Sequence, residues 1–358
     1  MKSRRPQAVH KAPLAAVAAA VAIAGCGAVK NTVTPQPGTI NQVKVALAGP
    51  PSALYIGIYE AQALGLFKQT DMNVKIVIPT AGEDPVSMVH NSQVLVGISS
   101  EPNVLLHRNE DEPVVGVAAI VHGPLSSITA TVPSGSSGGV GVGTGTTTTA
   151  TTTTATTTTA TTTTAGKTTA AKTAKTTKTT TVPSGVIMTA TSTTPTSTSP
   201  TSTTSTSTTP TTTTTLSEPD STLWPAKLQQ LLSAPGYPTY DGLVIVVRKG
   251  SIVDHAPLIR RFVQAVARGY RAARANPTQA ITNLITEVPS LAPQQALETA
   301  ELTAAMPYFF PAGGKVWGWQ REAQWNSFGS WMTQHQLISN PNAITDASDN
   351  ELLPGQGV

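Results

Sequence analysis

The chain has 358 residues and a formal net charge of +4, from 23 basic and 19 acidic side chains. Residues 1–25 and 131–215 each carry four Lys or Arg residues and no acid, so removing these eight charges from +4 leaves −4 on the rest. The remaining residues therefore offer no basic face, and this excludes a nucleic-acid partner bound through charge.

The N-terminus has the features of an exported protein. A basic stretch, MKSRRPQAVHK, precedes APLAAVAAAVAIAG, an apolar stretch too short to span a bilayer as a helix. The next residues, IAGCG, resemble a bacterial lipobox, in which Cys26 would carry the lipid. We predict a lipoprotein signal peptide over 1–25, an anchor on Cys26 at the outer face of the cell membrane, and a flexible tether over 26–42.

Residues 43–130 are predicted to form an α/β lobe. The strand-like runs are 43–49, 72–79, 94–99 and 113–121. They alternate with helical segments at 53–67, 84–92 and 101–109. Such alternation favours a parallel sheet that is covered by helices on both faces.

A low-complexity tract is predicted over 131–222. Its centre, TTTTATTTTATTTTATTTTA at 146–165, repeats one five-residue unit four times. Thr, Ser, Ala and Pro bury too little apolar surface to offset the loss of conformational entropy on folding. We therefore expect this tract to be disordered.

Folded character returns over 223–358. The sequence predicts helices at 225–233, 254–277, 278–286 and 293–305, and a strand at 242–249. The tryptophans at 317, 319, 325 and 331 are expected to pack in the core.

The sequence contains no catalytic or metal-binding motif. Cys26 is the only cysteine, which excludes an intrachain disulfide and a multi-cysteine metal site. The six histidines include no i, i+4 pair, and the glycine-rich run at 138–145 follows no strand and opens no helix. We expect no metal and no cofactor.

Several stretches taken together resemble one family. GIYEAQALGLF (57–67), VLVGISSEPNVLL (94–106) and PTYDGLVIVVR (238–248) are similar to ABC-transporter substrate-binding lipoproteins for the thiamine-precursor pyrimidine, which are related to sulfonate, taurine and nitrate receptors. The resemblance covers about 43–130 and 236–356. It implies an α/β, two-lobed fold of the periplasmic-binding-protein-like type II, with a ligand cleft between the lobes.

By position in the matching stretches, the resemblance assigns Tyr55, Tyr59, Glu101 and Tyr240 to ligand binding. Tyr55 and Tyr240 would sandwich a flat or small polar solute. The alternative for Tyr59 and Tyr240 is that they are packed core aromatics. The turn AGPPSALY (48–55) lacks the acid, aromatic residue, asparagines and histidine of the pyrimidine receptors, and Gly242 replaces a glutamate.

The threonine tract stands where the family builds the middle of its second lobe, so the second lobe is expected to be incomplete. The resemblance implies a non-enzymatic receptor that delivers a small solute to an ABC permease subunit. Enzymatic relatives use a cysteine cluster that this chain lacks. The alternative is a surface lipoprotein that carries a receptor remnant and a Thr-rich, glycosylated stalk and does not transport.

Overall fold

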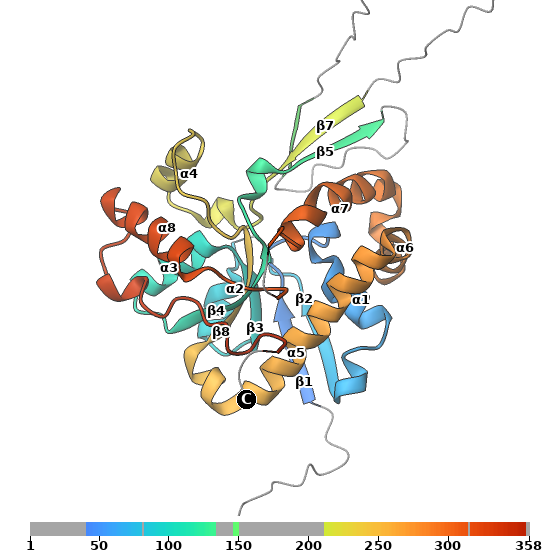
Figure 1. Ribbon diagram of the computed structural model, residues 1–358, viewed down its shortest axis with the longest axis horizontal. Coiled ribbons are helices and arrows are strands. Elements are labelled where there is room, and N and C mark those ends of the chain that lie inside the picture. Colours follow the sequence, from blue (N-terminus) through green and yellow to red (C-terminus); the bar gives the residue numbers. More distant parts are fainter. Residues whose placement is uncertain (1–40, 81, 134–145, 150–210, 314–315, 356–358) are drawn as a thin grey trace, which may run out of the picture. The chain divides into compact units, whose positions relative to one another are not determined.

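The computed structural model describes residues 41–80, 82–133, 146–149, 211–313 and 316–355. The predicted signal peptide, Cys26, most of the tether and most of the threonine tract lie outside these residues. The predicted α/β fold class is confirmed, because a mixed sheet is covered by helices on both faces (Figure 1).

Five strands form the main sheet, in the order β2-β1-β3-β8-β4. They are β1 (Asn41–Ala46), β2 (Met72–Val77), β3 (Val96–Ser99), β4 (Val114–Val121) and β8 (Leu243–Arg248). β1 runs parallel to β2 and β3, whereas β8 runs antiparallel to both of its neighbours, β3 and β4.

The position of β8 corrects two expectations. The sheet is mixed rather than parallel, and residues 243–248 lie inside the first-lobe sheet, although the sequence places them in the remainder of a second lobe. Leu243 to Val247 are all buried, which requires neighbours on both edges and cover on both faces. An apolar run does not specify the direction of its partners.

The helices follow most of the predicted ranges. They are α1 (Ile56–Ala63), α2 (Pro85–His90), α3 (Glu101–Asn109), α4 (Ala226–Leu232), α5 (Lys249–Ala275), α6 (Pro277–Glu287), α7 (Gln295–Phe309) and α8 (Glu322–Gln334). Short 3₁₀ segments are η1 (Ala53–Tyr55), η2 (Lys68–Thr70), η3 (Leu125–Ser127), η4 (Ser221–Leu223), η5 (Pro289–Gln294) and η6 (Pro341–Ala343).

The strand β8 shows how the core is divided. Leu243, Ile245 and Val247 pack in one cluster with apolar side chains of α1, α5, α6 and α7. Val244 and Val246 point to the other face and pack with side chains of α2, α3, α4 and α8. Successive side chains of the strand therefore pack against two different helical layers, one on each side of the sheet.

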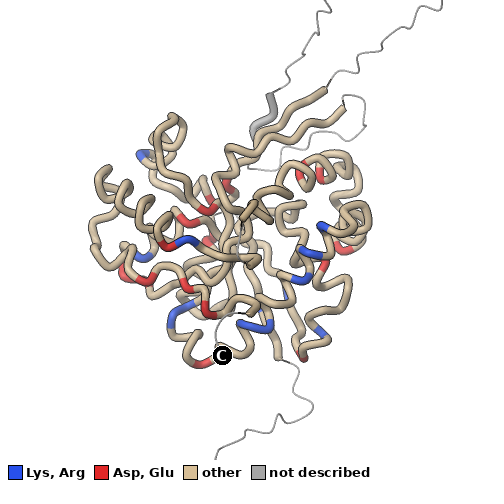
Figure 2. The backbone as a smooth tube through the Cα atoms, in the orientation of Figure 1, with Lys and Arg blue, Asp and Glu red and all other residues tan. Residues whose placement is uncertain are grey.

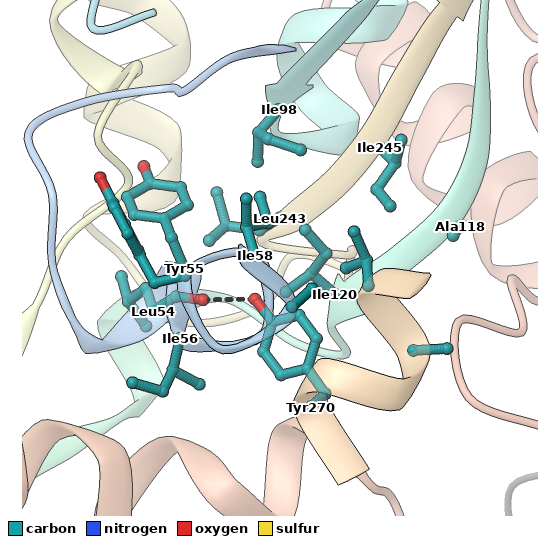
Figure 3. Packing of buried hydrophobic residues seen from close by; sticks show 14 of the residues in the cluster. Leu54, Tyr55, Ile56, Ile58, Ile98, Ala118, Ile120, Leu243, Ile245 and Tyr270 are labelled. Atoms are coloured by element: carbon teal, nitrogen blue, oxygen red, sulfur yellow. Dashed lines mark hydrogen bonds between the residues drawn. The ribbon is translucent and has the colours of Figure 1, made fainter. Parts of the chain in front are cut away.

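Helices α1 and α5 touch backbone to backbone. A Cβ atom at Gly269 would lie 1.9 Å from the carbonyl oxygen of Gly57, and one at Gly57 would lie 2.0 Å from Cδ2 of Tyr270. The Tyr270 hydroxyl donates to the Leu54 carbonyl at 2.7 Å, as Figure 3 shows. Glycine is required at both positions, since any side chain would separate the two helices.

A second, three-stranded sheet forms at the borders of the threonine tract. It is antiparallel in the order β5-β7-β6, with β5 (Thr129–Pro133), β6 (Thr146–Thr149) and β7 (Thr211–Leu216). Part of the tract predicted to be disordered is thus ordered. The reason is that Ala130, Thr214 and Leu216 are buried and that β5 packs against α7. These contacts give β5 and β7 a buried side.

Arg108 links the segment 342–345 to α3 and β4. Its guanidinium donates to the carbonyl oxygens of Val114 at 2.7 Å, Ala343 at 2.7 Å and Asn342 at 3.0 Å, and also to that of Thr345. Burial lowers the pKa of Arg108. One side chain from α3 thus satisfies four carbonyl groups, which would otherwise lack donors.

Charged residues of both signs are interspersed along the described backbone (Figure 2). Within the described ranges, none of the helices is sufficiently long and apolar to cross a membrane.

Candidate functional site

Three loops and the start of β8 meet at one edge of the main sheet. Because β8 is antiparallel to β3 and β4, the carboxyl ends of β1, β3 and β4 lie at the same edge as the amino end of β8. Ligands of open α/β sheets bind outside this edge. Four buried acids gather here, and we call them the acidic cluster: Glu101, Glu218, Asp220 and Asp241.

The structure brings three of the four predicted ligand residues to this edge. Glu101 belongs to the acidic cluster, Tyr240 contacts it, and Tyr55 is close enough for the charge of Asp220 to raise its pKa, after the larger effect of burial. The Tyr55 hydroxyl lies near the backbone of Ala48 and Gly49 but forms no well-aligned hydrogen bond. These placements keep the three residues as candidates for ligand contact.

Two hydrogen bonds with backbone amides as donors join Glu101 and Asp241. The Glu101 amide donates to the Asp241 carbonyl at 3.0 Å, and the Asp241 amide donates to Glu101 Oε2 at 2.8 Å. Gln324 Nε2 donates to the same Oε2 at 3.3 Å. Burial and then the charge of Asp241 raise the pKa of Glu101 well above its usual range. This exchange joins the start of α3 to the start of β8.

Asp220 is bound by the start of α3. Its Oδ2 accepts from Ser99 Oγ at 2.7 Å, from the Ser100 amide at 2.9 Å and from Ser100 Oγ at 2.9 Å. Burial raises the pKa of Asp220, and these three donors oppose that rise. Asp220, in the segment that follows β7, is therefore fixed at the carboxyl end of β3.

Glu218 is held by the loop after β4 and by Tyr240. Its Oε1 accepts from the Leu125 amide at 2.9 Å and from the Tyr240 hydroxyl at 2.7 Å. Burial raises the pKa of Glu218 to about 8. The Tyr240 ring packs on Phe328 at 4.8 Å between centroids. Tyr240 is therefore packed against Phe328 and donates its hydroxyl to Glu218, and its contact with a solute stays a prediction.

The acidic cluster retains acceptors that no donor satisfies. Glu101 Oε1, Glu218 Oε2, Asp220 Oδ1 and both carboxyl oxygens of Asp241 are buried without a hydrogen bond. The only ion-pair contact to the cluster within the described residues is His122 Nδ1, 3.4 Å from Asp241 Oδ1. Buried polar groups are usually satisfied, so five such oxygen atoms at one edge require an explanation.

A chain of hydrogen bonds leads from Asp220 toward the surface. Asn103 Nδ2 donates to Ser99 Oγ at 3.0 Å and to Asp84 Oδ2 at 3.1 Å. His107 lies between Asp84 Oδ2, 2.7 Å from Nε2, and Glu112 Oε2, 2.9 Å from Nδ1. Burial alone would lower the pKa of His107, but the hydrogen bonds and charges of Asp84 and Glu112 raise it. Burial alone would raise the pKa of Asp84, but the hydrogen bond and charge of His107 lower it.

Tyr59 lies elsewhere. It lines a surface pocket of about 600 Å³ together with Gln62, Lys75 and Glu287, beside the edge strand β2. Burial and then the charge of Glu287 raise the pKa of Tyr59. The structure therefore does not join Tyr59 to the acidic cluster. No group of three or more His, Cys, Asp or Glu side chains in the described part of the chain could hold a metal ion.

Sequence reasoning missed Glu218, Asp220 and Asp241 as site residues. Asp241 lies inside the PTYD stretch that carries the resemblance, directly after Tyr240. Glu218 and Asp220 were hidden because they fall in the tract predicted to be disordered. One signal was present: Glu218 is the first acid after Glu112, and Asp220 follows two residues later.

Known proteins match the same parts of the chain. A family model described as NMT1/THI5 like matches residues 53–136 and 230–280. The formylaminopyrimidine-binding protein of Halalkalibacterium halodurans is 34% identical over 89 residues, which are 25% of this chain and 27% of that protein. The match thus spans about a quarter of the length of the curated relative.

Two solved structures of sulfonate-binding proteins are also similar. The alkanesulfonate-binding protein SsuA from Xanthomonas axonopodis pv. citri, bound to MOPS, has a TM-score of 0.44 and 11% identity, over 86% of this chain and 98% of that chain. The periplasmic aliphatic sulphonate binding protein SsuA from Escherichia coli has a TM-score of 0.44 and 10% identity, over 88% and 93%. The family model and the curated relative confirm the resemblance carried by the sequence motifs, and the chain is similar to NMT1/THI5-like substrate-binding proteins.

Proposed function

We propose that this protein is the extracytoplasmic solute-binding component of an ABC importer, and that its solute is a small heteroaromatic compound rich in N–H donors, such as an aminopyrimidine. The resemblance of the motifs and the formylaminopyrimidine-binding relative support the class of solute. The acidic cluster would bind it and a permease subunit would receive it. A lipid on Cys26 would hold the protein at the outer face of the membrane.

The unsatisfied oxygen atoms of the acidic cluster carry this proposal. Glu101 Oε1, Glu218 Oε2, Asp220 Oδ1 and the two Asp241 oxygens can only accept hydrogen bonds when ionised. A ligand with amino groups would supply the missing donors. Hydrogen bonds to ionised groups in a buried site are stronger than those between neutral groups, so such a ligand would gain both affinity and orientation.

The same cluster disfavours an anionic solute. A sulfonate or nitrate would bring negative charge next to four acids, and the described residues provide only His122 as an ion-pair partner there. Burying a charge beside like charges is costly. The electrostatics therefore favour the pyrimidine side of the resemblance over the sulfonate side.

Binding of an amine should release protons. Burial raises the pKa of Glu218 to about 8, so Glu218 is mostly protonated in the free protein at neutral pH. A donor-rich ligand prefers the ionised carboxylates. Its affinity should rise with pH, by up to about tenfold for each pH unit below 8, and then level off.

Calorimetric titration of the purified mature chain tests the proposal. The panel contains aminopyrimidines, their analogues without amino groups, and small sulfonates. We expect binding of an aminopyrimidine with proton release in buffers of different ionisation enthalpy. Glu101→Gln should weaken binding of the aminopyrimidine about tenfold or more, because glutamine has no negative charge and replaces one acceptor oxygen by an amide donor. Glu301→Gln is the matched control, since Glu301 is buried but lies on α7 outside the cluster.

One observation favours the alternative of a receptor remnant on a stalk. The acidic cluster is closed, because its four residues are at most 4% exposed, and the second sheet consists largely of threonine strands. If no member of the panel binds, the solute-binding proposal is wrong and this alternative gains.

A further inference from the structure

We infer that Asp220 is a built-in anion that occupies an oxyanion site at the start of α3 and thereby excludes free carboxylates and sulfonates from the cluster. This inference rests on the proposed function, because it concerns the same site and names the residue that decides its specificity. The juxtaposition that carries it is one carboxyl oxygen, Oδ2, that accepts from three donors of two consecutive serines.

The donors of Ser99 and Ser100 are oriented before any ligand arrives. Ser99 Oγ accepts from Asn103 Nδ2 at 3.0 Å, and Ser100 Oγ accepts from the Asn103 amide as the N-cap of α3. Each serine oxygen is thus used as an acceptor by Asn103, which leaves its proton for Asp220. The Ser100 amide adds a third donor to the same point. Three fixed donors form an anion-binding site.

Asp220 is delivered to this site by the residues around it. Pro219 packs against the loop after β1 so closely that a Cβ atom at Gly49 would lie 2.7 Å from Pro219 Cβ. Glu218 is fixed by the Leu125 amide and the Tyr240 hydroxyl. Residues 218–220 therefore contact the loops after β1, β3 and β4. Asp220 itself is 1% exposed, so its carboxyl group does not exchange freely with solvent anions.

As a consequence, a side chain of the protein itself decides whether this site binds hydrogen-bond donors or anions. With Asp220 in place, the serine donors are used and the outward oxygen, Oδ1, remains an unsatisfied acceptor. Without the carboxyl group, the same edge would present three donors. Loss of one side chain should therefore convert a site that accepts hydrogen bonds into one that binds small anions.

Chemical rescue tests this inference without any knowledge of the natural solute. Asp220→Ala removes one carboxyl group and leaves Cβ, so formate has the size of the missing group. We expect the variant to melt at a lower temperature than wild type and sodium formate to raise that temperature saturably, by on the order of 5 °C. Sodium chloride at equal ionic strength is the salt control, and the larger benzoate should not rescue.

Two further variants sharpen the test. Asp220→Asn keeps an acceptor oxygen against the serines, so formate should not change its melting temperature. Asp220→Ala combined with Ser99→Ala lacks one donor and should require at least several-fold more formate. If Asp220→Ala does not fold in chloride, its refolding yield in formate is measured instead, and recovery specific to formate supports the inference.

The outcomes separate this inference from the proposed function. Absence of a formate-specific effect, or an equal effect on wild type, overturns the oxyanion site even if an aminopyrimidine binds. Rescue by formate in a protein that binds no aminopyrimidine supports the oxyanion site and refutes the proposed solute class.

Discussion

Replacing Glu218 by glutamine should make the protein more stable at neutral pH. Glu218 is buried, its Oε1 accepts two hydrogen bonds and its Oε2 has none. Glutamine resembles the protonated acid in shape and keeps the acceptor for Leu125 and Tyr240. The unsatisfied donor that it places at the second position is matched by the O–H of the protonated acid, so the two neutral forms should be similar in stability.

The magnitude follows from the pKa of Glu218, which burial raises from 4.5 to about 8. The folded state binds the proton more tightly than the unfolded state, so the stabilisation from protonation is complete below pH 4.5. It is lost between pH 4.5 and about 8, at about 1.4 kcal/mol for each pH unit. Glu218→Gln remains neutral throughout and should exceed wild type by up to about 3 kcal/mol near pH 7.

Urea denaturation of both proteins across this pH range measures the difference. The two stabilities should coincide near pH 4 to 5 and diverge steadily up to about pH 8, where the gap becomes constant. Glu322→Gln is the control, because Glu322 is exposed on α8 and its replacement should change stability by less than about 0.5 kcal/mol. A Glu218→Gln variant that is less stable than wild type by the same amount at every pH would refute the reasoning.

Three other predictions concern packing and the anchor. Gly269→Ala should destabilise the protein by about 3 kcal/mol or more in urea denaturation, since its Cβ would meet the Gly57 carbonyl, whereas alanine at the open Gly250 should be tolerated. Arg108→Met should cost about 3 kcal/mol or more by the same measurement, because four carbonyl groups lose their donor, and full stability would contradict that role. Cys26→Ala should move the protein from the membrane fraction to the medium or leave the leader uncut, and membrane-bound, normally processed protein would exclude the lipid anchor.

Most elements could be predicted from local patterns, and their pairing could not. The helix predicted at 101–109 is α3 with the same bounds, because Ser100 caps it and Pro102 stands in its first turn. The strand predicted at 242–249 exists as β8, but its antiparallel insertion between β3 and β4 depends on contacts across the whole chain. The alternation of apolar residues along a strand predicts which of its faces are buried, but it does not predict which strands pair with it.

The sequence predicts only those residues of the candidate site that lie in stretches with the family pattern. Glu101 and Tyr240 were found because they stand in stretches with the family pattern, and both reach the acidic cluster. Tyr59 stands in such a stretch too, yet its side chain lines a different pocket, since a helical position alone does not decide which cavity a buried ring borders. Glu218 and Asp220 follow low-complexity sequence, where composition predicts disorder and hides single functional residues.

The insertion of β8 between β3 and β4 makes this protein depend on the integrity of its reading frame. A chain that stops within the threonine repeats would contain β1 to β4 but no strand to join β3 to β4. It would leave the unpaired edge of β3 and the fully apolar β4 open to other chains, which is a known route to aggregation. Truncated products should therefore be degraded, because the main sheet can be completed only after the C-terminal half of the chain has been synthesised.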